Sequence, residues 1–151
     1  MQGGDSLSVL LVEDNAGYAR LVQELLRNHA AIRLAWVETL AAALARLGEI
    51  PVDTVLLDLG LPDSQGLETV TRVLRAHPTL PVIVLTGQAD DALALAALKA
   101  GAQDYLLKEI LDAGTLERAI RYAYERKRAE ETLRQLNATL EQRVKERTAE
   151  L

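Results

Sequence analysis

Five side chains that could do chemistry stand at the ends of apolar runs in this sequence. They are Glu13, Asp14, Asp58, Thr86 and Lys108. Three are carboxylates, one carries a hydroxyl and one carries an ammonium group. Three carboxylates that lie close together repel one another and are not expected to stay ionised without a cation. The set therefore predicts a charged site that needs a positive partner.

The residue types favour phosphoryl chemistry with a divalent metal. Mg²⁺ prefers hard oxygen ligands and keeps several waters, which suits a group of carboxylates. A lysine ammonium can hold a phosphoryl oxygen as a point charge, and the Thr86 hydroxyl can donate to another. An Asp side chain is an accepted nucleophile that forms an aspartyl phosphate. Asp58, which follows the apolar run Thr54–Leu57, is the first candidate for that role.

These side chains can meet only if the apolar runs are strands of one sheet. Short apolar runs bounded by turn residues predict strands at 7–12, 54–58, 81–85 and 103–107, with a less apolar one at 32–37. Three- and four-residue spacing of apolar residues predicts intervening helices at 18–26, 40–47, 66–76 and 90–100. Strands that alternate with helices predict a parallel sheet covered on both faces. Ligands bind at the carboxyl ends of such strands.

Local signals suggest where two of these helices begin or end. Asp14 or Asn15 could cap the first helix, and Gly48 with Pro51 is expected to stop the second. The N-terminal segment 1–6 is short and polar, and we interpret it as a flexible end.

Composition agrees with one α/β domain and excludes several other classes. Apolar residues make up 49% of the 151, enough for a core, and the absence of Cys excludes disulfides and thiolate metal sites. No apolar run reaches the length of a membrane span, and no signal-peptide pattern is present. Residues 1–111 hold fourteen acidic and eight basic side chains. We therefore expect a cytoplasmic protein whose segment seen here binds neither membrane nor nucleic acid directly.

Four stretches together resemble the receiver domain of response regulators in two-component signalling. They are residues 9–15 (VLLVEDN), 56–63 with 66–68 (LLDLGLPD and GLE), 84–87 (VLTG) and 100–108 (AGAQDYLLK). Each motif is weak by itself, but all occur in order at the family's spacing, and the resemblance covers residues 6–122. It implies a flavodoxin-like, doubly wound α/β fold whose five-stranded parallel sheet has the order 2-1-3-4-5.

The resemblance also implies a metal site and a phosphoryl acceptor. Asp58 would accept a phosphoryl group from the phosphohistidine of a partner histidine kinase or phosphotransfer protein. Glu13 and Asp14 would hold Mg²⁺ together with Asp58 and the backbone carbonyl of Gly60. The chain would catalyse only its own phosphorylation and dephosphorylation, and so would not be an enzyme in the usual sense.

The far side of the site carries the switch roles that the resemblance implies. Lys108 would pair with the phosphoryl oxygens, Thr86 would move to bond the phosphoryl group, and Tyr105 would turn inward behind it. Gly60 and Gln88 are the positions where the lifetime of the phosphoryl group would be tuned.

One residue departs from the family pattern. Glu109 stands where receivers usually have Pro after the Lys, often in a cis peptide bond. A cis bond to a non-proline residue costs about 2.5–4 kcal/mol. The loop after Lys108 is therefore expected to be either trans and re-routed or cis and strained.

The C-terminal segment predicts a long charged helix that pairs with a second copy. The helical pattern does not stop after Asp112, and residues 112–151 hold nine basic and eight acidic side chains. A heptad-like seam with a stutter after Leu140 runs along it. Its members are Tyr122, Arg126, Ala129, Leu133, Leu136, Leu140, Val144, Arg147 and Leu151. An isolated helix of this length is marginal in water, so we expect a parallel homodimer. Residues 7–122 would be the receiver and 123–151 a coiled-coil linker leading to an output domain.

Other interpretations stay open beside this one. A receiver-like module that dimerises or binds partners without phosphorylation would keep the same fold, and Glu109 is the feature that favours it. An aspartyl-phosphate phosphatase of the haloacid dehalogenase type would need a second Asp two positions after the nucleophile, where this chain has Gly60. His29 and His77 are interpreted as surface or cap residues and Trp36 as a packing residue.

Overall fold

Five parallel strands form the centre of the computed structural model, which describes residues 6–87 and 91–150. They are β1 (Leu7–Val12), β2 (Ile32–Val37), β3 (Thr54–Asp58), β6 (Val82–Thr86) and β7 (Asp104–Leu107). All neighbouring pairs run parallel, and the order across the sheet is β2-β1-β3-β6-β7. Counted along the chain, these strands have the order 2-1-3-4-5, which confirms the predicted flavodoxin-like fold.

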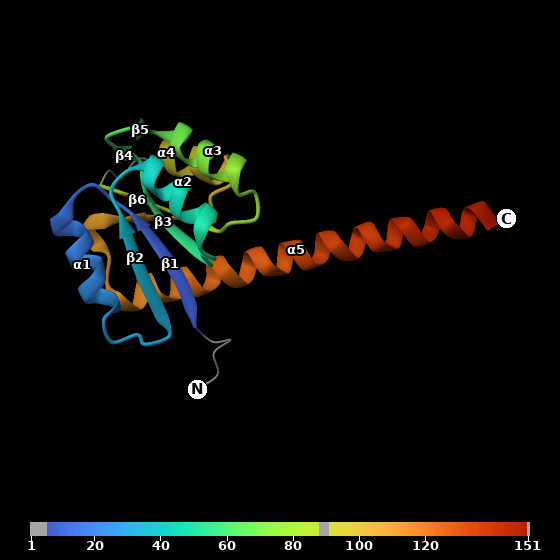
Figure 1. Ribbon diagram of the computed structural model, residues 1–151, viewed down its shortest axis with the longest axis horizontal. Helices are drawn as coiled ribbons and strands as arrows, with labels where there is room; N and C mark the ends of the chain where they lie inside the picture. The colour runs from blue at the N-terminus through green and yellow to red at the C-terminus, as the bar shows by residue number, and fades with distance from the viewer. Residues whose placement is uncertain (1–5, 88–90, 151) are drawn as a thin grey trace.

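Helices cover both faces of this sheet (Figure 1). One layer contains α2 (Leu40–Glu49), α3 (Leu67–Ala76) and α4 (Asp91–Lys99), and the other contains α1 (Ala16–Leu26) and the first turns of α5 (Ala113–Glu150). Alternate side chains of each strand point to opposite faces, so every strand feeds both cores. β3 and β6 are buried at every position. Their continuous apolar sequences follow from this burial.

The second helix ends at a different residue from the one predicted. α2 continues through Gly48 to Glu49, and the extended backbone of Ile50 ends it. Pro51 disfavours a helical conformation at the residue before it. The Pro, and not the Gly, is therefore the stop signal, and the expectation for Gly48 was wrong. The strands predicted at 81–85 and 103–107 are observed at Val82–Thr86 and Asp104–Leu107. The helix predicted at 90–100 is observed at Asp91–Lys99, and Asp90 lies outside the described residues.

A small hairpin after β3 was not predicted from the sequence. It consists of β4 (Gly60–Leu61) and β5 (Ser64–Gln65). Asp63 at its tip accepts hydrogen bonds from the backbone N–H groups of Leu40 and Ala41, both at 2.9 Å. These two donors hold the pKa of Asp63 below its ordinary value. The hairpin is thereby attached to the N-terminus of α2, and it confines the chain that follows Asp58.

The last helix leaves the domain as a rod (Figure 1). Its first turns bury Leu116, Ala119, Ile120 and Ala123 in the core shared with α1. Beyond them its described side chains are exposed or half-buried. Leu133, Leu136, Leu140 and Val144 of the predicted seam are 54–63% exposed.

The predicted boundary between residues 122 and 123 falls inside this continuous helix, and Ala123, on its C-terminal side, is still buried in the core. Residues 1–5 of the expected flexible end and Leu151 of the seam lie outside the described residues. Among the described helices, none combines the length and apolar character needed to cross a membrane.

Candidate functional site

The carboxyl edge of the sheet collects the side chains predicted to do chemistry. Glu13 and Asp14 follow β1, Asp58 ends β3, Thr86 ends β6, and Lys108 follows β7. β1 and β3 are hydrogen-bonded neighbours, so the acids at their ends meet. Asp58 is level with Leu85 of β6, and Thr86 is level with Leu107 of β7. Thr86 therefore stands one residue and Lys108 two residues further out than Asp58, where they can contact a group attached to it.

The three acids form one cluster of oxygen donors. Carboxylate oxygens of Glu13, Asp14 and Asp58 all lie within 4.8 Å of one another. Glu13 is fully buried and Asp58 nearly so, whereas Asp14 is exposed. Burial raises the pKa of Glu13, and the charge of Asp58 adds to that effect against the hydrogen bonds from Lys108 and Asn15. The cluster thus combines a buried wall with one side open to solvent.

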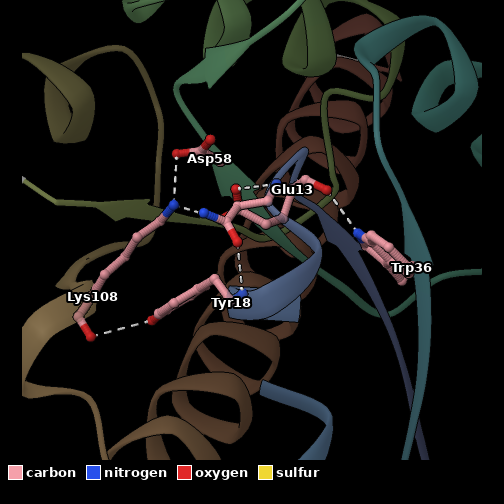
Figure 2. Close-up of polar contacts among 6 residues, drawn as sticks. Glu13, Tyr18, Trp36, Asp58 and Lys108 are labelled. Atoms are coloured by element: carbon pink, nitrogen blue, oxygen red, sulfur yellow. Dashed lines mark hydrogen bonds and ion pairs between the residues drawn. The ribbon is translucent and has the colours of Figure 1, made fainter. Parts of the chain in front are cut away.

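Lys108 is the cation of this cluster. Its Nζ lies 2.5 Å from Oε1 of Glu13 and 3.3 Å from Oδ1 of Asp58 (Figure 2). Burial lowers the pKa of Lys108, but the bond to Glu13 and the charges of Asp58 and Glu13 outweigh it, so the net shift is upward. The ammonium therefore stays charged at neutral pH and can neutralise one of the acids.

The donor set fits a hard divalent cation. Three carboxylates and one ammonium leave a formal excess of two negative charges when all are ionised. Mg²⁺ prefers oxygen ligands of this kind, and the open side at Asp14 leaves room for the waters that it keeps. Gly60 borders the same place, since a Cβ built on it would lie 3.9 Å from Oδ2 of Asp58.

Two aromatic residues belong to the site although sequence reasoning assigned them no role there. Tyr18 in the first turn of α1 lies with its ring centroid 4.7 Å from Nζ of Lys108, and its hydroxyl donates to the Lys108 carbonyl at 3.4 Å. Trp36 of β2 donates from Nε1 to the backbone carbonyl of Glu13 at 2.7 Å. The register pairs Trp36 with Leu11. The predicted strand order could therefore have placed Trp36 beside Glu13.

Hydrogen bonds at the first turn of α1 link Glu13 to Tyr18. Asn15, and not Asp14, caps the helix by accepting the N–H of Tyr18 at 3.0 Å. The backbone N–H of Asn15 in turn donates to Oε2 of Glu13 at 3.1 Å. Burial, followed by the charges of Glu13 and Asp58, raises the pKa of Tyr18 to about 12. Its hydroxyl therefore remains a donor at neutral pH.

The residues predicted to act as a switch, Thr86 and Tyr105, lie on β6 and β7, on the other side of Asp58 from β1. Thr86 is buried, and Tyr105 is half-buried against the core under α2, α3 and α4. Tyr105 also lines a cavity of about 340 Å³ together with Ile110. The predicted tuning position Gln88 lies outside the described residues.

Of the two forms expected for the loop after Lys108, the structure has the one with a trans peptide bond. The described residues contain no cis peptide bond, so the link from Lys108 to Glu109 is trans. Lys108–Ile110 forms a 3₁₀ turn that connects β7 to α5.

Comparison with known proteins agrees with this geometry. Residues 9–121 match the family described as "Response regulator receiver domain". The KDP operon transcriptional regulatory protein KdpE of Escherichia coli (strain K12) is 38% identical over 119 residues, which are 79% of this chain and 52% of KdpE. The chain thus spans about half the length of this relative.

Solved receiver structures superimpose on most of the chain. The signal receiver domain of a putative LuxO repressor protein from Vibrio parahaemolyticus has a TM-score of 0.75 at 25% identity, covering 85% of this chain and 97% of that one. The BeF3-activated receiver domain of DrrB has a TM-score of 0.68 at 27% identity, covering 80% and 98%. The fold, the matched residues and these relatives together place the chain in the response regulator receiver family.

Proposed function

We propose that this chain is a phospho-acceptor switch in which Asp58 takes a phosphoryl group from the phosphohistidine of a histidine kinase or phosphotransfer protein. The observation that carries the proposal is the position of the Asp58 carboxylate. It ends β3, lies within reach of two further acids, and has the Lys108 ammonium 3.3 Å from Oδ1. Membership of the receiver family supports it.

The transfer requires one bond to form and one to break. A carboxylate oxygen of Asp58 attacks the phosphorus, and the bond from phosphorus to the donor's imidazole nitrogen breaks. The imidazole leaves and takes a proton from solvent. Lys108 already pairs with Asp58 and can follow the negative charge onto the phosphoryl oxygens. Thr86, at the end of the neighbouring strand, can donate its hydroxyl to another of those oxygens.

Glu13, Asp14 and Asp58 would hold Mg²⁺, with the carbonyl of Gly60 as a further ligand. The excess of two negative charges in the cluster supports this assignment. When bound, the ion neutralises charge on the transferring phosphoryl group. Asp58 must serve both as ligand and as nucleophile, and its two carboxylate oxygens allow that.

The output is proposed to lie in α5. Residues 7–122 would be the receiver and 123–151 a linker that forms a parallel homodimer in the cytoplasm. The exposed seam side chains Leu133, Leu136, Leu140 and Val144 support the pairing, since apolar side chains at this spacing are typical of coiled coils. Phosphorylation would change the geometry or the affinity of the dimer. It can do so only if the two states of the receiver differ in their contacts with α5.

The names of the relatives bear on one further expectation. KdpE is named as a transcriptional regulatory protein, and this chain matches about half of it. The prediction that the present segment does not itself contact nucleic acid is not supported by that comparison. It remains a proposal that rests on the acidic excess of residues 1–111.

A second candidate is an interaction module that works without phosphorylation. Glu109 beside Lys108 favours it, and the complete set of acids with Thr86 and Lys108 favours the switch. Beryllofluoride with Mg²⁺ can separate the two, with Trp36 as the fluorescent reporter because its indole contacts the loop of Glu13. The switch predicts a saturable change that Asp58→Asn abolishes. No change in the wild type at saturating reagent would favour the interaction module.

A further inference from the structure

Lys108 must hold one ammonium group in a defined place between two acids. A lysine side chain is a flexible four-carbon stem with a point charge at its end. Its backbone stands where β7 gives way to the 3₁₀ turn. Its Nζ nevertheless reaches both Glu13 and Asp58. Phosphorylation of Asp58 would change one of these two acids. A contact with a third residue is therefore needed to keep the Lys108 side chain in the same place in both states.

Tyr18 contacts Lys108 at both ends. Its ring lies 4.7 Å from Nζ, and its hydroxyl reaches the Lys108 backbone carbonyl at 3.4 Å (Figure 2). The hydroxyl contact is long for a hydrogen bond between oxygens, so the ring contact is the stronger of the two. A cation over an aromatic face gains more when the pair is partly desolvated, and the Lys108 side chain is only 18% exposed.

Tyr18 is linked to Glu13 by two routes, one through Asn15 and one through Lys108. Glu13 accepts the N–H of Asn15, and Asn15 accepts the N–H of Tyr18. The Tyr18 ring contacts Lys108, and Lys108 returns to the other oxygen of Glu13. These four contacts form a closed circuit. The backbone of Tyr18 is therefore tied to Glu13 through the cap of α1, while its ring contacts the ammonium between the acids.

We propose that Tyr18 is a positioning residue for Lys108, and that its aromatic ring holds the ammonium in place for the phosphoryl group on Asp58. The inference rests on the proposed function, because the consequence is measured through Asp58 phosphorylation. Removing the ring should slow phosphorylation from a small donor by roughly three- to tenfold, the size expected for one partly desolvated cation–π contact. Removing the hydroxyl alone should change the rate much less.

The test compares Tyr18→Leu, Tyr18→Phe and the wild type for their rates of phosphorylation by acetyl phosphate with Mg²⁺. Tyr124→Leu is the matched control, because Tyr124 carries a similar contact with Arg128 at 5.6 Å on α5, far from the acids. The expected order is wild type and Tyr124→Leu fastest, Tyr18→Phe close to them, and Tyr18→Leu slowest. A Tyr18→Leu variant as fast as the wild type would overturn the proposal, as would Tyr18→Phe as slow as Tyr18→Leu.

A spectroscopic measurement on the wild type keeps the proposal testable should the Leu variant not fold. Protons on Cε of Lys108, assigned with Lys108→Arg, should be shifted upfield by the Tyr18 ring current without Mg²⁺ or donor. The shift should persist in Tyr18→Phe. Lys108 protons at ordinary lysine positions would overturn the proposal. A wild type that takes no phosphoryl group would contradict both the proposed function and the positioning role. Normal phosphorylation of the wild type at a rate that loss of the ring does not change would overturn the positioning role alone.

Discussion

The carboxyl edge of the sheet and the rod of α5 are both rich in opposite charges, yet the same kinds of pair have different consequences in the two places. At the edge, Lys108 joins Glu13 and Asp58 with little solvent around any of them. On α5, Arg134 lies 2.7 Å from Glu131 with 73% of the arginine side chain exposed. Exposed pairs typically contribute about 0–1 kcal/mol. A buried charge that loses its partner has no water to replace it.

The difference indicates which kind of binding each region is suited to. The edge holds a cluster with excess negative charge, which under the proposed function would bind a cation and a phosphoryl group. The rod holds compensated surface charge beside an exposed apolar seam, which is proposed to pair with a second copy. Substitutions in the edge and in the rod should separate these two properties.

A single substitution in the seam of α5 should disrupt the proposed homodimer. Leu136→Asp places a charge at the centre of the proposed coiled coil and should weaken dimerisation by at least about a hundredfold, since unpaired buried charges cost several kcal/mol. Sedimentation across a range of concentrations measures this. Ala138→Asp, on the opposite side of α5, is the control and should leave the dimer intact. Monomeric wild type would remove the dimer from the account while leaving the edge untouched.

The edge should lose its metal through Asp14→Asn. Loss of even a supporting residue at a metal site costs roughly 10–100-fold in affinity, and Asp14 is proposed as a direct ligand. The Mg²⁺ titration of Trp36 fluorescence should shift by at least that factor. Glu38→Gln, which changes an exposed acid that follows β2 outside the cluster, should leave the midpoint nearly unchanged. Equal midpoints for wild type and Asp14→Asn would exclude Asp14 as a ligand.

Removing one cation should affect stability in the edge more than in the rod. Lys108→Met keeps the apolar stem but leaves Glu13 buried without its partner, and should cost about 1–3 kcal/mol in the free energy of unfolding without Mg²⁺. Arg134→Met on the rod should change it by less than about 1 kcal/mol. Urea unfolding measures both. Similar losses for the two variants would contradict the distinction between the regions.

Alkaline pH should weaken the edge in a defined window. The pKa of Tyr18 is raised to about 12 from the ordinary 10.0, and that of Lys108 is raised as well. The folded state therefore retains these protons where the unfolded chain has lost them. The stabilisation is complete below pH 10 and is lost as the pH rises from 10 to 12. Tyr18→Phe should flatten this decline in urea unfolding, whereas Tyr122→Phe on the exposed part of α5 should follow the wild type.

The sequence predicted the features that depend on local patterns and on strand order. Asp58 could be placed at a sheet edge because a buried parallel strand has a continuous apolar sequence that ends at a polar residue. The meeting of Glu13 with Asp58 followed from the order of the strands, which came from the resemblance. Both features can be predicted without knowing in which direction the side chains point.

The features that the sequence did not predict depend on how elements are rotated against one another. The ring of Tyr18 reaches Lys108 across ninety positions of sequence, and only the packed orientation of α1 brings them together. The hairpin of Gly60–Leu61 with Ser64–Gln65 is too short for a periodic signal. Glycine commonly follows helices, which makes Gly48 the expected stop, but α2 ends at Glu49, just before Ile50 and Pro51.

The central claim is that Asp58 accepts a phosphoryl group, and intact-protein mass spectrometry tests it most directly. Wild type incubated with acetyl phosphate and Mg²⁺ should gain the mass of one phosphoryl group, and Asp58→Asn under the same conditions should gain none. Chelation of Mg²⁺ should suppress the gain in the wild type. A wild type that stays unmodified at saturating donor and Mg²⁺, or an Asp58→Asn variant modified to the same extent, would contradict the account.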